Sequence, residues 1–145
     1  MNTTDTDIVD VLLSQHEQIE QLMAAVATDD DRSAAFDDLQ TMLKMHEFGE
    51  QKVVHPVTRD AGNSSAIAEE SVQEENRADR ALAILAGLGV DHPDFLDEFA
   101  AFRSDVLNHA KHEELHEFPP LREQLPAAEL RAMASRLLDV QAETP

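Results

Sequence analysis

The sequence predicts an all-α protein, an antiparallel up-down four-helix bundle with an additional short C-terminal helix. Apolar residues recur at intervals of three and four, which is the period of an α-helix. Only four of the 145 residues are glycine, and runs of β-branched residues are short. Four long amphipathic segments with short connections are typical of a bundle whose neighbouring helices run antiparallel. We therefore expect one domain, with the bundle over about residues 5–118 and the extra helix over about 126–142.

The first two helices are expected over about residues 6–27 and 33–55, with an acidic loop between them. Asp5 or Thr6 is the expected N-cap of the first helix, because either side chain can accept a hydrogen bond from an amide of the first turn. The inward rows consist of Ile8, Leu12, Ile19, Leu22, Met23 and Val26 in the first helix and Phe36, Leu39, Leu43 and Val53 in the second. The connection that follows is marked by Pro56, Gly62 and Asn63.

The third helix is expected over about residues 64–88, and the fourth from residue 93 or 94 to about 117. Pro119 and Pro120 are expected to end the fourth helix, because proline has no amide donor and clashes with the preceding turn. A last amphipathic segment follows Pro126 and is expected to pack on the outside or at the end of the bundle. The inward rows consist of Ile67, Ala78, Leu82 and Leu85 in the third helix, Phe95, Phe99, Phe102 and Val106 in the fourth, and Leu130, Met133, Leu137 and Leu138 in the last segment.

The charge and composition exclude several classes of partner and site. The chain has 11 Lys and Arg against 30 Asp and Glu, a net charge of −19, which repels nucleic-acid phosphates and anionic lipid, so we expect neither nucleic acid nor a membrane surface as partner. The same charge disfavours close self-association and favours a monomer. The absence of cysteine excludes disulfides, thiolate metal sites and thiol catalysis. The N-terminal MNTTDTDIVD lacks the features of a signal peptide, so a cytoplasmic protein is expected.

Histidine and glutamate residues interrupt the apolar rows at intervals that keep them on the inward faces of the helices. In the third helix, steps through Ser71 and Glu75 bridge the row from Ile67 to Ala78, and a step through Glu74 is the alternative. The interrupting residues of the other helices are His16 in the first, His46 and Glu50 in the second, and His109 and Glu113 in the fourth.

Burying so many ionisable groups without partners costs several kcal/mol each, so a stable bundle needs a compensating charge. A metal ion supplies it, because neutral imidazole and carboxylate are both metal ligands. The two H-x-x-x-E pairs, His46 with Glu50 and His109 with Glu113, each place two ligands one helical turn apart. Two such pairs can hold two metal ions, with each glutamate able to bridge. Imidazole and carboxylate without thiolate favour iron or manganese over a structural zinc.

Each of these residues, taken singly, has a simpler interpretation. A lone inward histidine such as His16 is more often a hydrogen-bonded core residue than a ligand. A single H-x-x-x-E pair is usually exposed, and Glu75 lies in a polar run of the kind that usually faces solvent. A plain bundle with buried polar residues is therefore the alternative. The coincidence of five such residues on the inward phase of three helices favours the metal site.

The remaining histidines are expected outside the site. His55 lies nine residues after His46, about 180° around an α-helix, and directly precedes a proline, so a role at the helix end is expected. His92 is expected in a loop and His112 on the flank of its helix. His116 continues the inward row near the mouth of the bundle, where an ordinary partly buried histidine is expected.

Three segments carry a resemblance to a known family, namely SQHEQIEQLM, LKMHEFGEQKVVHPV and LNHAKHEELHEFPPL. Together they resemble the hemerythrin-like proteins, also called the HHE cation-binding domain family, over about residues 8–121. The resemblance implies a four-helix bundle with a non-heme di-iron centre, bridged by an oxo or hydroxo group and by carboxylates. By position it implies that His16, His46 and His109 are terminal ligands and that Glu50 and Glu113 bridge. Glu114 is the alternative to Glu113, since classical hemerythrins space this carboxylate one residue further.

The third helix departs from the family pattern, which supplies one or two histidines there. This segment contains none, and the register places Glu75 at the usual histidine position and Ser71 one turn earlier. Either Glu75 replaces the histidine as a ligand or the site lacks that ligand. An additional anionic ligand would stabilise the ferric state and lower the reduction potential, which disfavours reversible dioxygen carriage.

The resemblance implies a protein that binds or reacts with dioxygen, peroxide or nitric oxide, with two iron ions as the cofactor and manganese as the less favoured metal. An iron- or redox-responsive sensor or interaction module is the first alternative. Iron binding or buffering without catalysis is the second. The sequence leaves open whether the protein is an enzyme, and a peroxide-decomposing, catalase-like activity is the enzymatic form of the hypothesis.

Overall fold

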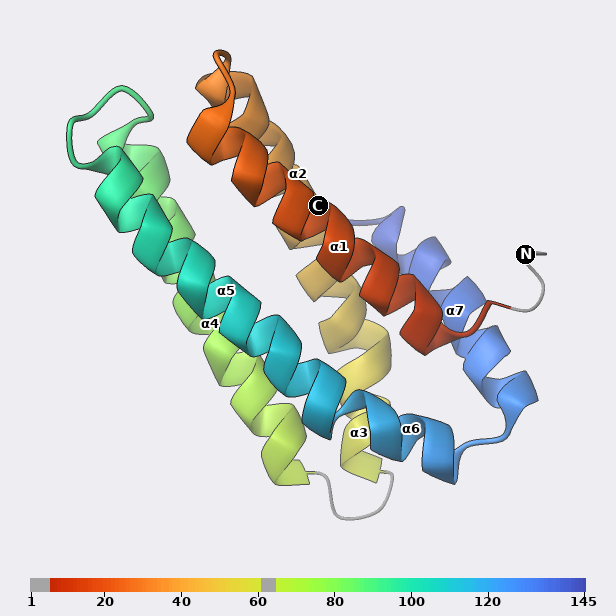
Figure 1. Ribbon diagram of the computed structural model, residues 1–145. Helices are drawn as coiled ribbons and strands as arrows, with labels where there is room; N and C mark the ends of the chain where they lie inside the picture. Colours follow the sequence, from red (N-terminus) through yellow and green to blue (C-terminus); the bar gives the residue numbers. More distant parts are fainter. Residues whose placement is uncertain (1–5, 61–64) are drawn as a thin grey trace.

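The computed structural model describes residues 6–60 and 65–145, and all regular secondary structure in these ranges is helical. Figure 1 shows α1 and α2 side by side as one pair of long helices and α4 and α5 as a second pair. The predicted all-α bundle is therefore confirmed. The elements are α1 (Ile8–Thr28), α2 (Arg32–Gly49), the π-helix η2 (Glu50–Val54), α3 (His55–Asp60), α4 (Ser65–Leu88), α5 (Phe95–His116), α6 (Phe118–Gln124) and α7 (Ala127–Gln141).

The N-cap of α1 is Asp7, so the expectation of Thr6 was wrong, and Asp5 lies outside the described residues. Asp7 accepts a hydrogen bond from the amide of Asp10, and the Asp10 side chain accepts one from the amide of Asp7, which completes a capping box. Arg122 of α6 contacts both carboxylates, at 3.0 Å and 2.8 Å. The start of α1 is thereby joined to a helix that the sequence did not predict.

The second long helix does not end at His55. It continues through the five-residue π-helix η2 and α3 as far as Asp60, so Pro56 lies inside the helical path. The wider hydrogen-bond ladder of a π-turn immediately precedes the proline and accommodates its missing amide donor. Gly62 and Asn63, the other expected connection residues, lie outside the described ranges.

The two prolines after α5 begin a helix and do not simply end one. Helix α5 ends at His116, and Glu117 caps it with its amide bonded to the carbonyl of Glu113. Pro119 and Pro120 then lie in the first turn of α6, where an amide donor has no helical partner and its absence costs nothing. The last segment forms α7, as expected, and Figure 1 shows it alongside α1.

The apolar core is divided into two clusters, and a polar layer lies between them. In α1 the division falls between Leu12 and Ile19, on either side of His16. One cluster consists mainly of Ile19, Met23, Val26, Phe36, Leu39, Leu43, Leu82, Leu85, Phe95, Phe99, Phe102 and Val106. The other consists of Ile8, Val9, Leu12, Val53, Val54, Phe118, Leu121, Leu130, Met133 and Leu137.

Across the described residues, no helix combines the length and the hydropathy that a membrane crossing requires.

A close approach between α7 and the end of α2 gives the first testable prediction. A Cβ atom on Gly49 would lie 2.5 Å from Leu137 Cδ1 and 2.8 Å from Gln141 Cγ. Gly49→Ala is therefore expected to push α7 outward and to lower the free energy of unfolding by about 1–3 kcal/mol. The matched control is Gly87→Ala, because nothing lies within 4 Å of a Cβ atom there and alanine favours the helix. Urea denaturation of both variants measures the difference; equal loss in both would contradict it.

Candidate metal centre

The six residues predicted from the sequence as metal ligands lie together in the polar layer between the two apolar clusters. Four long helical segments supply them, so the layer crosses the whole bundle. Most are almost fully buried, and His109 is the most exposed, with 15% of its side chain accessible. The six are His16 from α1, His46 from α2, Glu50 from the start of η2, Glu75 from α4, and His109 and Glu113 from α5.

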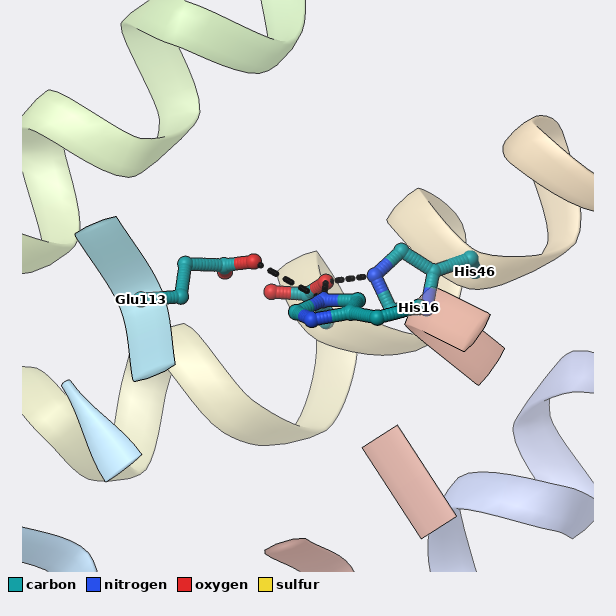
Figure 2. Close-up of side chains that lie close together, drawn as sticks. His16, His46 and Glu113 are labelled. Atoms are coloured by element: carbon teal, nitrogen blue, oxygen red, sulfur yellow. Dashed lines mark ion pairs between the residues drawn. The ribbon is translucent and has the colours of Figure 1, made fainter. Parts of the chain in front are cut away.

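One group of potential ligands consists of His16, His46, Glu50 and Glu113, whose donor atoms all lie within 4.8 Å of one another. His16 Nε2 is 3.3 Å from Glu113 Oε1 and 4.0 Å from Glu50 Oε1. His46 Nε2 contacts Glu50 Oε1 from one turn earlier on the same helix. Figure 2 shows His16, His46 and Glu113 pointing toward one another from three helices.

A second group consists of Glu50, His55, Glu75 and Glu113, again with donor atoms within 4.8 Å of one another. His55 Nε2 lies 2.8 Å from Glu75 Oε2 and 3.5 Å from Glu50 Oε2. His109 Nε2 borders this group, at 3.1 Å from Glu75 Oε2 and 3.4 Å from Glu113 Oε1. Glu50 and Glu113 belong to both groups and therefore lie between two sets of imidazole nitrogens.

Three of the four inward imidazole rings are oriented by an acceptor on the side of the ring away from the central carboxylates of Glu50 and Glu113. In each ring Nδ1 donates to that acceptor, so Nε2 is directed toward the central carboxylates. The acceptors are Glu114 Oε2 for His16 at 2.8 Å, Gln15 Oε1 for His46 at 2.8 Å and Glu117 Oε2 for His55 at 2.7 Å.

The C-terminal helix reaches the layer through this outer set of contacts. Gln141 of α7 and Gln15 of α1 exchange two amide hydrogen bonds, both of 2.9 Å. Gln15 Oε1 is also the acceptor of His46 Nδ1. The orientation of the His46 ring therefore depends on how α7 packs against α1.

Several buried polar atoms lack hydrogen-bond partners where the two groups of potential ligands meet. Both carboxylate oxygens of Glu50, both of Glu113, and Nε2 of His16 have none. Buried polar groups are nearly always paired, because an unpaired group loses its interaction with water without replacement. Carboxylate oxygens and imidazole nitrogens directed at common points are the donor set of a bound metal ion, so the residues present fit a metal site.

The electrostatics of the layer favour positive charge strongly. Burial lowers the pKa of His55, but hydrogen bonds to Glu117 and Glu75 outweigh it and raise the pKa to about 11. Burial and the neighbouring Glu50 carboxylate raise the pKa of Glu113 well above its ordinary value. Cations, as protons or as metal ions, are therefore held where these carboxylates converge.

Two residues of the layer were not predicted, and the expected helix-end role of His55 was wrong. His55 is 1% exposed and faces the site, because the π-turn η2 alters the helical register between Glu50 and His55. Glu117 is equally buried and holds His55 from the junction of α5 and α6. Its position four residues after Glu113 was the signal that could have revealed it, whereas no pattern in the sequence marks the π-turn.

The other polar residues considered from the sequence are placed more peripherally. Glu74 is half-buried, 3.3 Å from His112 on the flank of α5, whereas Glu75 faces the layer. Glu114 is 40% exposed and serves as the partner of His16, whereas Glu113 is buried among the imidazole rings. His116 is exposed, which overturns its expected place on the inward row.

A cavity of about 230 Å³ borders the layer and lies between the two helix pairs. His16, His46 and His109 form part of its wall. Much of the rest is apolar and includes Ile19, Met23, Leu43, Phe102 and Val106. One water molecule needs roughly 10–15 Å³ of such space, so the cavity has room for a small molecule beside the imidazole rings.

Comparison with known proteins agrees with this architecture. The sequence model of the hemerythrin HHE cation binding domain matches residues 7–121. The crystal structure of a hemerythrin HHE cation binding domain-containing protein from Mycobacterium kansasii, described as an Rv2633c homolog, superposes with a TM-score of 0.74 at 22% sequence identity. The superposition covers 95% of this chain and 89% of that chain. No curated protein matches the sequence significantly.

A second buried carboxyl beside the layer gives a pH-dependent prediction. Burial and a hydrogen bond with Asp79 raise the pKa of Glu47 to about 11, so the folded protein binds a proton there that the unfolded chain releases above its ordinary pKa of 4.5. Because the folded state then binds more protons, this group makes the free energy of unfolding fall as pH rises from about 4.5 toward 11.

Glu47→Gln supplies the neutral form permanently. We expect the metal-depleted variant to be more stable than the metal-depleted parent at pH 8, by on the order of 1 kcal/mol or more, since each pKa unit is worth about 1.4 kcal/mol. The gain should shrink toward pH 5. The exposed Glu69→Gln is the control, and thermal unfolding at both pH values measures the effect. A gain that does not depend on pH would contradict it.

Proposed function

Because the chain belongs to the hemerythrin HHE cation-binding domain family, we propose that it holds two iron ions in the polar layer and binds or reacts with dioxygen, peroxide or nitric oxide there. The observation that carries the proposal is that Glu50 and Glu113 each lie between two histidine-containing groups without a hydrogen-bond partner. Imidazole and carboxylate donors without thiolate suit iron, with manganese as the less favoured metal. When bound, such ions supply Lewis-acid and redox chemistry.

The residues divide into two ligand sets with shared carboxylates. His16 and His46 would hold one ion, and Glu75 and His109 would hold the other. Glu50 and Glu113 lie between the two sets and would be shared by both ions. Glu50, Glu75, Glu113 and Glu117 carry a formal charge of −4 when ionised, which two divalent cations balance.

The cavity beside the layer supports a small neutral ligand. It borders His16 and His46, and its wall combines apolar side chains with a few charged ones, among them Arg77 and Asp105. The net charge of −19 repels anions from the surface but not dioxygen, nitric oxide or hydrogen peroxide. The surface charge therefore favours an uncharged small molecule as the ligand.

Glu75 favours reaction over reversible carriage. It is 1% exposed and lies within 3.1 Å of two imidazole nitrogens, so it would bring an additional negative charge to the ion beside it. Negative ligands stabilise the higher-charged state of a metal. Peroxide decomposition therefore fits the donor set better than a role that requires a stable reduced pair.

A sensor or interaction module is the second candidate, and one observation favours it. The hydrogen-bonded pair of Gln15 and Gln141 connects His46 with α7, which lies on the outside of the bundle. A change of charge at His46 could therefore alter the packing of α7. Protease sensitivity of α7 that differs between the oxidised and reduced protein would support this candidate.

Metal content per chain tests the proposed ligand set. We expect freshly purified protein to contain about two iron ions per chain and Glu113→Gln to retain one or fewer, because Glu113 belongs to both ligand groups. Glu114→Gln is the matched control. It changes the neighbouring residue, which binds only the outer nitrogen of His16, and should still reach two ions at saturating iron. Wild-type protein without transition metal, which also gains none anaerobically, would refute the proposal.

Removing the metal should lower the thermal stability of the protein and abolish its consumption of peroxide. Without cations, the carboxylates of Glu50, Glu75 and Glu113 repel one another in the core, so chelation is expected to lower the melting temperature. Each tenfold excess of metal over its dissociation constant contributes about 1.4 kcal/mol. Differential scanning fluorimetry with and without chelator measures this. Peroxide consumption by loaded and chelated protein, followed optically, then distinguishes an enzyme from a protein that only binds.

A further inference from the structure

We propose that His55 is a metal ligand, which η2 brings to the second ligand group and which Glu117 holds in position. The inference rests on the proposed dinuclear centre and deepens it. It assigns to each ion two imidazole rings, His16 and His46 on one side and His55 and His109 on the other. Helix α4 contains no histidine, so its contribution to the second group is the carboxylate of Glu75 alone.

The π-turn is what brings His55 to the site. In a continuous α-helix, residues five apart are about 140° apart around the axis, so His55 would face away from Glu50. In a π-turn, the amide of a residue bonds the carbonyl five residues earlier, and the two positions come nearly above one another. The amide of His55 bonds the carbonyl of Glu50 in this way. As a result His55 Nε2 lies 3.5 Å from Glu50 Oε2.

Glu117 holds the ring through a fully partnered carboxylate. Its Oε2 accepts from His55 Nδ1 at 2.7 Å and from the Thr58 hydroxyl at 2.8 Å, and its Oε1 accepts from the Ser71 hydroxyl at 3.0 Å. All four side chains belong to residues at most 2% exposed. These three donors hold the carboxylate in one orientation. A metal ion bound at Nε2 would leave the remaining ring proton on Nδ1, where Glu117 accepts it, and Nε2 faces Glu50 and Glu75.

The contacts around His55 are more numerous than a single buried hydrogen bond would need. Glu117 comes from the junction of α5 and α6, and it accepts from Thr58 of α3, the helix of His55 itself, and from Ser71 of α4, so one carboxylate behind the ring joins three parts of the fold. The inner side faces two carboxylates, one of them without any hydrogen-bond partner. The alternative is that His55 is a permanently protonated ring that neutralises Glu75 and Glu117 and binds no metal. The two hypotheses predict different numbers of bound metal ions and different magnetic resonance shifts for the His55 ring.

Metal titration of two variants tests the assignment. With cobalt(II) as the probe, we expect wild-type protein to bind two ions, and His55→Ala to bind the first unchanged and the second at least 100-fold more weakly. Glu117→Gln should weaken the second ion by about 10–100-fold, because it removes only the support of the ring. The exposed His116→Ala is the control and should bind both ions as wild type does. Two ions bound at unchanged affinity by His55→Ala would overturn the assignment and leave the proposed centre intact.

A measurement on the unmodified chain keeps the proposal testable even if the variants do not fold. In cobalt-loaded protein with isotope-labelled histidine, rings bonded to the metal show large contact shifts. Of the seven histidines, four should be shifted in this way, and His92, His112 and His116 should not. Three or fewer shifted rings would contradict the assignment of two imidazole rings to each ion and overturn the proposal. A wild-type chain that binds no cobalt and no iron would overturn this proposal and the proposed function together.

Discussion

Buried negative charge is the constraint on which the rest of the structure depends. Glu50, Glu75, Glu113 and Glu117 are each at most 1% exposed and lie in one layer between two apolar clusters. Within residues 6–60 and 65–145, no lysine or arginine is buried, so no permanently positive side chain balances the four carboxylates inside the core. An isolated buried carboxylate is costly, and four of them together repel. Only cations held by the layer remove both costs, and the imidazole rings are placed to share in holding them.

The outer contacts explain why residues without metal chemistry matter to the site. His46 is oriented by Gln15, which is held by Gln141 of α7. His55 is oriented by Glu117, which is held by hydroxyl groups of α3, the helix of His55 itself, and of α4. The close approach of α7 at Gly49 belongs to the same arrangement, because Gln141 must come near the end of α2 to reach Gln15. The orientation of the imidazole rings in the layer therefore depends on how the outer helices pack.

The bundle itself tolerates wide variation in sequence. A structure with 22% identity superposes over 95% of this chain, since a correct pattern of apolar and polar positions largely specifies a bundle. The charge of the polar layer depends instead on its individual donor residues. Helix α4 places a carboxylate in the layer, and the π-turn places an imidazole there from the preceding helical path. The carboxylate from α4 adds negative charge to one side of the layer. That charge affects the reactivity of the site more than the fold does.

Local periodicity in the sequence was enough to predict the four long helices, the C-terminal helix and five inward polar positions. His46 and Glu50, or His109 and Glu113, lie one turn apart on any α-helix, and the apolar residues around them orient that face inward. Glu75 could be placed only as one of two candidates. The tertiary structure decided the rest. His55 turns inward because the hydrogen-bond ladder changes to a π-turn, which side-chain pattern does not encode, and Glu117 is buried because separate segments converge on it. Periodicity assumes a constant rotation per residue and describes one helix at a time, so it fails where that rotation changes and where partners come from elsewhere in the fold.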